Sequence, residues 1–322
     1  MEPETSSPSG ASAPGPASAW SRVAGTLRQQ PGWGVLLFIL LGALATLLIV
    51  APIDGVLRRY HAPAYLAIPL GELALAVAVV LVTAIMAGAE QRPFWSFGLE
   101  RRAAARRFGE GALWGILSLT VLLGAMRAGG HFYFGALDES PVAAVRFGLL
   151  WLAMFLLVGI FEELTFRGYL QFTLSRGLGF WPTAIILSAL FGLSHRGNSG
   201  ETSYGVFAAG LFGLFICLTL KRTGSLWWAI GFHMAWDYAE SFLYSVPDSG
   251  TVIPGHLLSS HFTGASWITG GSAGPEGSLF IFPLLGVMAL LFALVYREPA
   301  KPQPAPEPVP EPAAANSPPL WP

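Results

Sequence analysis

The sequence predicts an all-α fold, a polytopic transmembrane helical bundle of about eight spans. Two observations lead to this prediction: apolar runs of bilayer length and a small share of charged residues. Apolar runs of about 17–25 residues recur, which is the length a helix needs to cross a hydrocarbon core. Hydrophobic residues make up 53% of the chain and charged residues 11%, whereas soluble domains carry about 25% charged residues. We therefore expect an integral membrane protein with membrane lipids as partners.

The eight expected spans follow the apolar runs and the turn residues between them. They cover residues 33–53, 64–88, 109–127, 143–165, 180–196, 204–221, 225–245 and 278–296. The fifth and sixth spans are short for a bilayer, which predicts local thinning or a water-filled cavity beside them. Residues 1–30 are expected to form a disordered cytoplasmic tail, residues 31–297 the transmembrane bundle, and the proline-rich residues 298–322 a second disordered tail.

The basic residues orient this bundle through the positive-inside rule. Of the 18 Lys and Arg residues, five fall on one side of the expected spans and the other 13 on the opposite side; the five are Arg58, Arg59, Arg127, Arg146 and Arg196. Both termini and the 89–108 loop are therefore expected in the cytoplasm, and the 246–277 loop, which has no Lys or Arg, outside. We expect a multi-pass protein of a bacterial plasma membrane. The net charge of -1, without a basic stripe, excludes nucleic acid as a partner.

Ionisable side chains inside the expected spans concentrate in three places. A charged side chain in mid-membrane costs about 2.5–3.5 kcal/mol on insertion scales, so such residues are candidates for a functional site. The fourth span ends in GIFEELTFRGYL, the fifth ends in ALFGLSH, and the seventh contains GFHMAWDYAE. The candidate residues are Glu162, Glu163, Arg167, His195, His233 and Asp237. A further acid, Glu72 in the second span, is expected to pair with a neighbouring helix.

Helix geometry separates the two glutamates of the fourth span. Glu163 and Arg167 are four residues apart, so they share a face and can neutralise each other. Glu162 lies about 100° around the helix from Glu163 and has no local partner. This arrangement predicts a structural ion pair beside a free, reactive carboxylate.

The spacing of the clusters predicts that they meet. The midpoint between residues 162 and 195 falls at the turn Gly177–Gly179, so an antiparallel hairpin would place Glu162 and His195 at the same height, with Phe191 on the face of His195. In the seventh span, His233 and Asp237 are four residues apart, so the carboxylate can orient the imidazole or both can ligate a metal. We expect one chamber below the membrane surface.

These three motifs resemble those of the CPBP family, the CAAX-protease and bacteriocin-processing membrane proteins also called the Abi family. Its pattern is EExxxR, then FxxxH, then HxxxN or HxxxD, which here correspond to Glu162–Arg167, Phe191–His195 and His233–Asp237. The family-like core covers residues 143–245. The order of the motifs on successive apolar helices makes the combination more specific than each motif alone.

The resemblance implies an intramembrane endopeptidase, a protease that hydrolyses peptide bonds of membrane-associated peptide or protein substrates. It implies that Glu162 and His195 activate a water molecule, and that His233 and Asp237 polarise the scissile carbonyl or hold its oxyanion. Asp237 stands where asparagine is commoner in the family. Because an ionised aspartate cannot donate a hydrogen bond, Asp237 must be protonated, orient His233 or bind a metal.

Other classes of intramembrane protease require motifs that can be looked for in the sequence. No HExxH zinc-protease motif and no GxGD motif of presenilin-like proteases occurs. The cofactor stays open: none is required, or a divalent metal such as Zn is held by His195, His233, Glu162 and Asp237. The alternative to an enzyme is a non-enzymatic membrane protein, either an immunity or scaffold protein or an ion-coupled transporter that uses the same acids as a relay.

Overall fold

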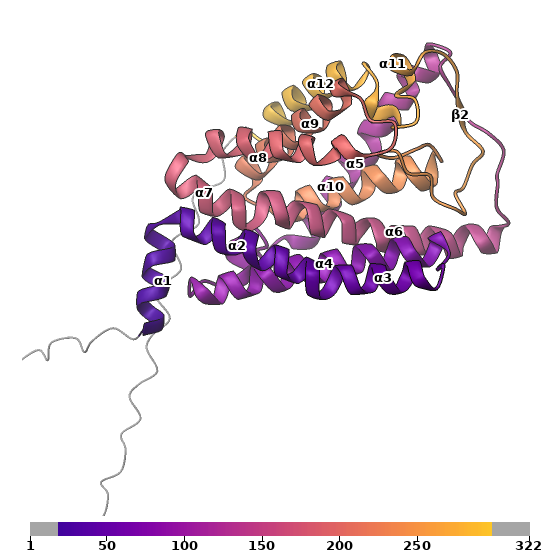
Figure 1. Ribbon diagram of the computed structural model, residues 1–322. Coiled ribbons are helices and arrows are strands. Elements are labelled where there is room, and N and C mark those ends of the chain that lie inside the picture. The colour runs from indigo at the N-terminus through magenta and orange to yellow at the C-terminus, as the bar shows by residue number, and fades with distance from the viewer. Residues whose placement is uncertain (1–18, 298–322) are drawn as a thin grey trace, which may run out of the picture.

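The computed structural model describes residues 19–297, and these residues form a bundle made almost entirely of helices (Figure 1). The long helical runs are α2 (Pro31–Ala45) continuing through η1 (Thr46–Val50) into α3 (Ala51–Arg59), α4 (Ala64–Ala89), α5 (Ala104–Ala128), α6 (Pro141–Glu163) continuing through η3 (Leu164–Tyr169) into α7 (Leu170–Leu178), α8 (Phe180–Ser194), α9 (Ser203–Thr223), α10 (Leu226–Tyr238) with η5 (Ala239–Leu243), and α12 (Ile281–Val295). The shorter elements are α1 (Ala19–Gln29), η2 (Phe94–Ser96), η4 (His195–Gly197), α11 (Ser266–Thr269) and η6 (Pro275–Gly277).

The all-α membrane bundle predicted from the sequence is confirmed. Each of the eight expected spans corresponds to one of the long helical runs. Five runs are long and apolar enough to cross a membrane by length and composition, namely 31–59, 64–89, 104–128, 141–178 and 203–223, and Ile281–Val295 is a shorter apolar helix. The expectation that the sixth span is short is wrong, because α9 has 21 residues. The fifth is short, since α8 has 15.

The N-terminal segment differs in part from the predicted disordered tail. Residues 1–18 lie outside the described residues, as do residues 298–322 of the second predicted tail. Residues 19–29, which the prediction placed in the first tail, form α1 instead. Ala24 and Leu27 are buried on one side of α1, so packing of this amphipathic face against the bundle stabilises a helix that composition alone does not predict.

Helix α10 lies at the centre of the bundle and packs against α5, α6 and α9. Small residues allow the closest of these contacts. A Cβ atom at Gly111 or Gly115 of α5 would overlap the carbonyls of Trp228 and Phe232 in α10, and one at Gly231 would overlap the carbonyl of Phe108. Glycines spaced four apart are a common means of close helix packing in membranes. They hold the α10 backbone in the interior.

A buried glutamate, Glu90, joins two helix ends of the bundle. Glu90, at the end of α4, is fully buried and accepts two hydrogen bonds from Arg176 of α7, at 2.7 and 2.9 Å, and one from the Tyr169 hydroxyl at 2.6 Å. The bidentate geometry makes this a strong charge-assisted contact. It joins α4 to the second half of the helix that carries the first motif.

The connections at one end of the bundle form a cap. β1 (Phe132–Tyr133) and β2 (His261–Phe262) are antiparallel, with Phe132 opposite Phe262 and Tyr133 opposite His261. They tie the 129–140 connection to the long connection after η5. Figure 1 places β2 and α11 at one end of the bundle and α1 at the other. The predicted irregular loop 246–277 is therefore built on short elements, and its predicted external position stays a prediction.

Candidate active site

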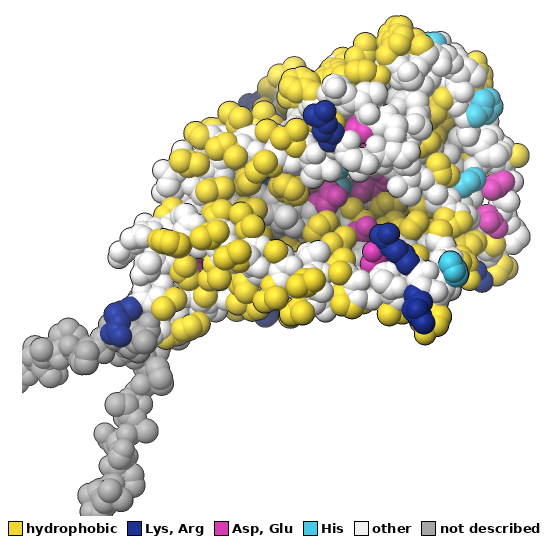
Figure 2. Space-filling model, in the orientation of Figure 1, with side chains coloured by type: hydrophobic (Ala, Val, Ile, Leu, Met, Phe, Trp, Pro, Cys, Tyr) yellow, Lys and Arg dark blue, Asp and Glu magenta, His cyan; other side chains and the backbone are white. Residues whose placement is uncertain are grey.

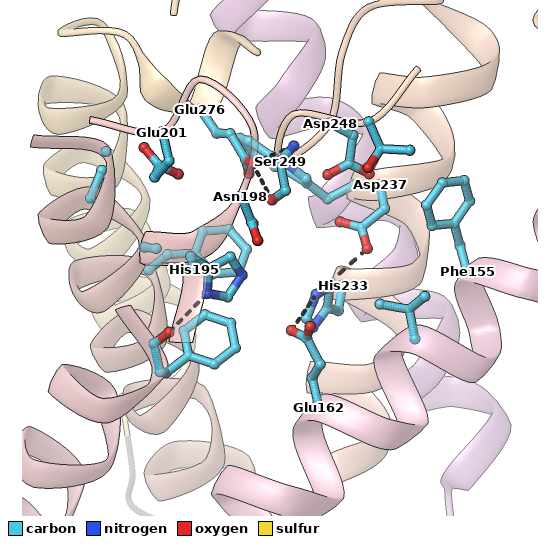
Figure 3. A pocket seen from close by; sticks show the side chains of 18 of the residues that line it. Phe155, Glu162, His195, Asn198, Glu201, His233, Asp237, Asp248, Ser249 and Glu276 are labelled. Atoms are coloured by element: carbon cyan, nitrogen blue, oxygen red, sulfur yellow. Dashed lines mark hydrogen bonds and ion pairs between the residues drawn. The ribbon is translucent and has the colours of Figure 1, made fainter. Parts of the chain in front are cut away.

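A cavity of about 200 Å³ opens between α4, α6, α8, α9 and α10. Figure 2 shows acidic and histidine side chains gathered in a hollow on a face that is otherwise largely hydrophobic. Ile68, Met154, Phe155 and Val158 give the cavity an apolar wall. Of the candidate residues, Glu162, His195, His233 and Asp237 line it (Figure 3). The sequence prediction of one shared chamber is consistent with this placement.

Three of the candidate side chains meet at one imidazole nitrogen. Nε2 of His233 lies 3.4 Å from Oε2 of Glu162 and 3.5 Å from Oδ2 of Asp237. Glu162 comes from the end of α6, and the other two are one turn apart on α10. The side chain of Glu162 is 21% exposed, against 8% for His233 and 10% for Asp237. Glu162 is thus the most exposed member of the group.

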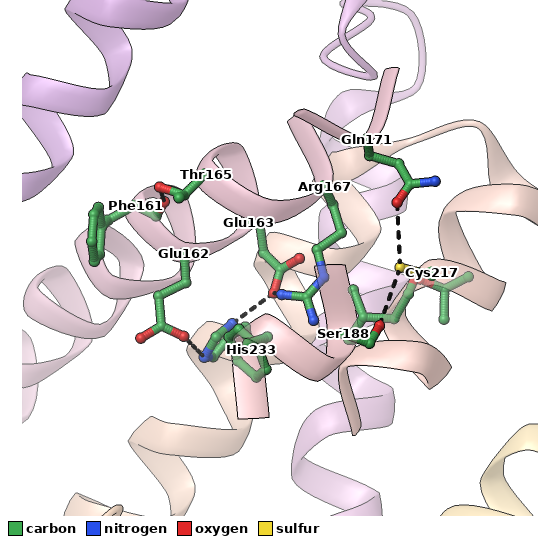
Figure 4. Close-up of polar contacts among 12 residues, drawn as sticks. Phe161, Glu162, Glu163, Thr165, Arg167, Gln171, Ser188, Cys217 and His233 are labelled. Atoms are coloured by element: carbon green, nitrogen blue, oxygen red, sulfur yellow. Dashed lines mark hydrogen bonds and ion pairs between the residues drawn. The ribbon is translucent and has the colours of Figure 1, made fainter. Parts of the chain in front are cut away.

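Glu163 and Arg167 form a buried pair that contacts His233 of this group (Figure 4). Both side chains are fully buried, and Nη1 of Arg167 lies 3.4 Å from Oε1 of Glu163, which agrees with the predicted ion pair. The same carboxylate oxygen lies 2.9 Å from Nδ1 of His233. A carboxylate paired with arginine accepts hydrogen bonds, so we assign the hydrogen to Nδ1. Nε2 therefore faces Glu162 and Asp237.

A π-turn separates the two halves of this helix. Arg167 lies in η3, and the backbone of the next residue, Gly168, leaves the helical region at ψ −119°. The Arg167 guanidinium lies 4.2 Å from the centre of the Phe191 ring. Such π-turns are frequent at functional sites because they change the direction of side chains within a helix. Here the turn follows directly after the two glutamates.

His195 stands on the opposite wall, at the end of α8 (Figure 3). Its Nδ1 lies 2.8 Å from the carbonyl oxygen of Phe191, so Nδ1 donates the hydrogen and Nε2 is left free in the neutral ring. The Phe191 ring packs against His195 at 4.7 Å and against His233 at 6.5 Å between ring centres. Phe191 is the wall that the sequence predicts. The direct neighbour of Glu162 is His233, however, rather than His195.

Several cavity residues were missed by the sequence prediction. Glu72, expected to pair with a neighbouring helix, lines the cavity instead, as do Asn198, Asp248, Ser249 and Glu276. The last three come from the loop after η5, whose path cannot be read from apolar periodicity. One sequence feature could have drawn attention to them. Residues 223–296 hold four acidic side chains and no Lys or Arg.

The loop carboxyl groups lie close together at the rim. Burial raises the pKa of Asp248 and of Glu276, although hydrogen bonds from Ser241 and Ser249 oppose the shift. Ser241 donates to Asp248 at 3.1 Å, and the Ser249 hydroxyl donates to Glu276 at 2.6 Å. These contacts fix the orientation of both loop acids toward the bundle.

The residues named for a zinc ion do not form a closed ligand set. His195 and His233 lie on opposite walls, and Nδ1 of each already has a hydrogen-bond partner. Within residues 19–297, the group of three mutually close metal-ligating side chains is Glu240, Asp248 and Glu276. It contains none of the four residues named for zinc.

The expectation that no serine stands in a GxSxG setting, which would exclude a rhomboid-like mechanism, is wrong. The loop contains a GxSxG sequence, Gly270-Gly271-Ser272-Ala273-Gly274. Ser272 packs against Gly200, and it is not among the cavity-lining residues of the described chain. No catalytic geometry supports this serine.

Comparison with known proteins bears on the segment that contains the motifs. No curated protein and no solved structure matches the chain. Residues 144–239, which hold all three motifs, match the family model described as "Type II CAAX prenyl endopeptidase Rce1-like", and this match confirms the resemblance to the CPBP family of membrane proteases.

Proposed function

We propose that this chain is an intramembrane endopeptidase that hydrolyses peptide bonds of membrane-associated substrates with a water molecule activated by Glu162. The observation that carries the proposal is the position of the Glu162 carboxylate. It is partly exposed in a cavity with an apolar wall, and it lies 3.4 Å from a histidine that a buried ion pair orients.

The proposed reaction needs no covalent intermediate. Glu162 takes a proton from the water molecule while the oxygen of that water attacks the scissile carbonyl carbon. When the C–N bond breaks, Glu162 returns the proton to the nitrogen of the leaving amine. Nε2 of His195, free on the opposite wall, helps to orient the water. General-base catalysis of this kind contributes about 10²–10⁴-fold to the rate.

The developing oxyanion requires hydrogen-bond donors. His233, with Glu163 on Nδ1, donates from Nε2 when it is protonated, and Asp237 orients it from one turn away. Asn198 lines the same cavity beside His195 (Figure 3) and offers an amide donor. This amide supplies the chemistry that an asparagine at position 237 would provide.

The test is hydrolysis of a membrane-peptide library by the purified chain in lipid nanodiscs. Glu162→Gln should lower the cleavage rate at least 10²-fold, because glutamine keeps the size of the side chain but cannot take the proton. Glu139→Gln, a change in the connection before α6 at a residue that does not line the cavity, serves as the matched control. Cleavage that withstands a chelator supports the glutamate mechanism, whereas loss restored by zinc supports a metal.

A second substitution, Glu162→Asp, distinguishes an enzyme from an ion relay. A relay tolerates exchange of Glu162 for aspartate, since only a titratable group is needed. If the wild type cleaves no peptide, and Glu162→Gln keeps full biological activity, the protease proposal fails.

A further inference from the structure

Three carboxylates from separate segments converge at the capped end of the cavity. Glu240 lies in η5, Asp248 follows in the loop, and Glu276 lies in η6. One carboxylate oxygen of each lies within 4.8 Å of those of the other two. Figure 3 shows Asp248 and Glu276 on the side of the cavity away from Glu162. The cluster shares no residue with the group around His233, although Asp248 and Glu276 line the same cavity.

Glu240 is the residue that requires explanation. Its side chain is 0% exposed, and neither carboxylate oxygen has a hydrogen-bond partner among residues 19–297. The indole N–H of Trp236, one turn earlier, is the nearby donor, but it makes no hydrogen bond of normal geometry to Glu240. A buried carboxylate without a partner is costly, because desolvation is not offset. The described side chains around Glu240 therefore leave its carboxylate without a hydrogen-bond partner, and a bound ligand would supply a partner.

The two other carboxylates are held with one oxygen each still available. Ser241 donates to Oδ2 of Asp248 at 3.1 Å. The backbone N–H and hydroxyl of Ser249 donate to Oε1 of Glu276 at 2.9 and 2.6 Å. Neither contact uses Oδ1 of Asp248 or Oε2 of Glu276. The hydrogen bonds thus pre-orient the ligands without consuming them.

No lysine or arginine of the described chain forms an ion pair with the cluster, and the positive group that acts on Glu276 is the imidazole of His195 in its protonated form. Residues 223–296 contain no Lys or Arg, and none of the three acids takes part in an ion pair between described residues. A backbone oxygen is close as well. A Cβ atom at Gly274 would meet both the carbonyl of Pro247 and Oε1 of Glu240. The carbonyl oxygen of Pro247 and Oε1 of Glu240 thus both lie beside Gly274.

We propose that Glu240, Asp248 and Glu276 bind a divalent cation, Ca²⁺, that fastens the loop after η5 to the end of α10. All the ligand atoms are oxygens, which Ca²⁺ prefers, and the set lacks the imidazole or thiolate that zinc sites use. Asp248 and Glu276 are only half-buried, so water can complete the coordination shell. The proposal does not depend on peptide hydrolysis.

The test uses the full-length chain in nanodiscs of neutral phosphatidylcholine, so that anionic lipids do not bind the probe. Ca²⁺ should raise the melting temperature of the wild type, with half-saturation at about 0.1–1 mM, the range of extracellular calcium modules. Tb³⁺, which replaces Ca²⁺, should give tryptophan-sensitised emission that Ca²⁺ displaces. Glu240→Gln should melt no lower without Ca²⁺ and should weaken binding of both ions at least 10-fold.

Matched variants separate this site from other acids. Asp248→Asn should show the same 10-fold loss in binding even if Glu240→Gln fails to fold, whereas Glu139→Gln and the cavity variant Glu162→Gln should bind as the wild type does. The proposal is overturned by an unchanged melting temperature together with no displaceable emission. It is equally overturned if Asp248→Asn binds normally, or if Glu162→Gln abolishes the emission.

Discussion

Replacing Glu163 with glutamine should destabilise the protein far more than the same change at Glu162. Arg167 is fully buried, and Glu163, at 3.4 Å, is the acidic side chain paired with it in the described chain. Two of its guanidinium nitrogens, Nε and Nη2, already have no hydrogen-bond partner there. Glu163→Gln leaves this cation uncompensated, and breaking a buried pair in this way costs about 3–5 kcal/mol.

The Phe191 ring does not offset this loss. The Arg167 guanidinium lies 4.2 Å from the centre of that ring, and this contact is the same in the wild type and in Glu163→Gln. With a shift of about 2–4 °C per kcal/mol for a chain of this size, the melting temperature should fall by about 6–20 °C. Glu162 has no buried arginine partner and its side chain is 21% exposed. Glu162→Gln should therefore stay within about 1 kcal/mol of the wild type.

The assay is thermal unfolding of both variants in the same nanodiscs, followed by intrinsic fluorescence. The double variant Glu163→Gln/Arg167→Met removes the stranded charge and should recover much of the lost stability, because replacing a whole buried pair costs less than breaking it. A melting temperature of Glu163→Gln within 2 °C or so of the wild type would refute the reasoning. A larger loss in Glu162→Gln would do the same.

Three further predictions concern packing, the site and the topology. Gly115→Leu should reduce the yield of folded protein, measured by size-exclusion chromatography, because a side chain there overlaps the Phe232 carbonyl; normal folding would contradict the close α5–α10 contact. Asn198→Ala should lower kcat about 10²-fold with little change in KM if its amide holds the oxyanion, and a change in KM alone would assign it to substrate binding. In a Cys217→Ser background, which has no other cysteine, Ala103→Cys should escape membrane-impermeant maleimide in intact cells; labelling would reverse the topology.

The membrane helices and the central motifs were predictable because each depends on local spacing. Apolar runs mark the spans, and residues four apart share a helix face, so the Glu163–Arg167 pair follows from the sequence alone. The hairpin argument brought Glu162 and His195 into one cavity for a similar reason. Two antiparallel helices joined by a short turn keep equidistant residues level.

Other features depend on contacts that spacing does not encode. The π-turn of η3 and the pairing of Glu162 with His233 arise from packing between α6 and α10. Glu276 reaches the rim through a loop of irregular backbone, 36 positions after Glu240. Helix α1 is formed by an amphipathic pattern too short to stand out beside a Pro-rich segment.

Because the hollow opens on a hydrophobic face, the concentration that determines ligand binding is the concentration of the ligand in the membrane. The surface around it is largely hydrophobic, so in a membrane that covers this face a ligand would enter from the hydrocarbon, where diffusion is two-dimensional. Its occupancy then follows its mole fraction among lipids, and diluting the vesicles in buffer leaves it unchanged. Adding inert lipid lowers it.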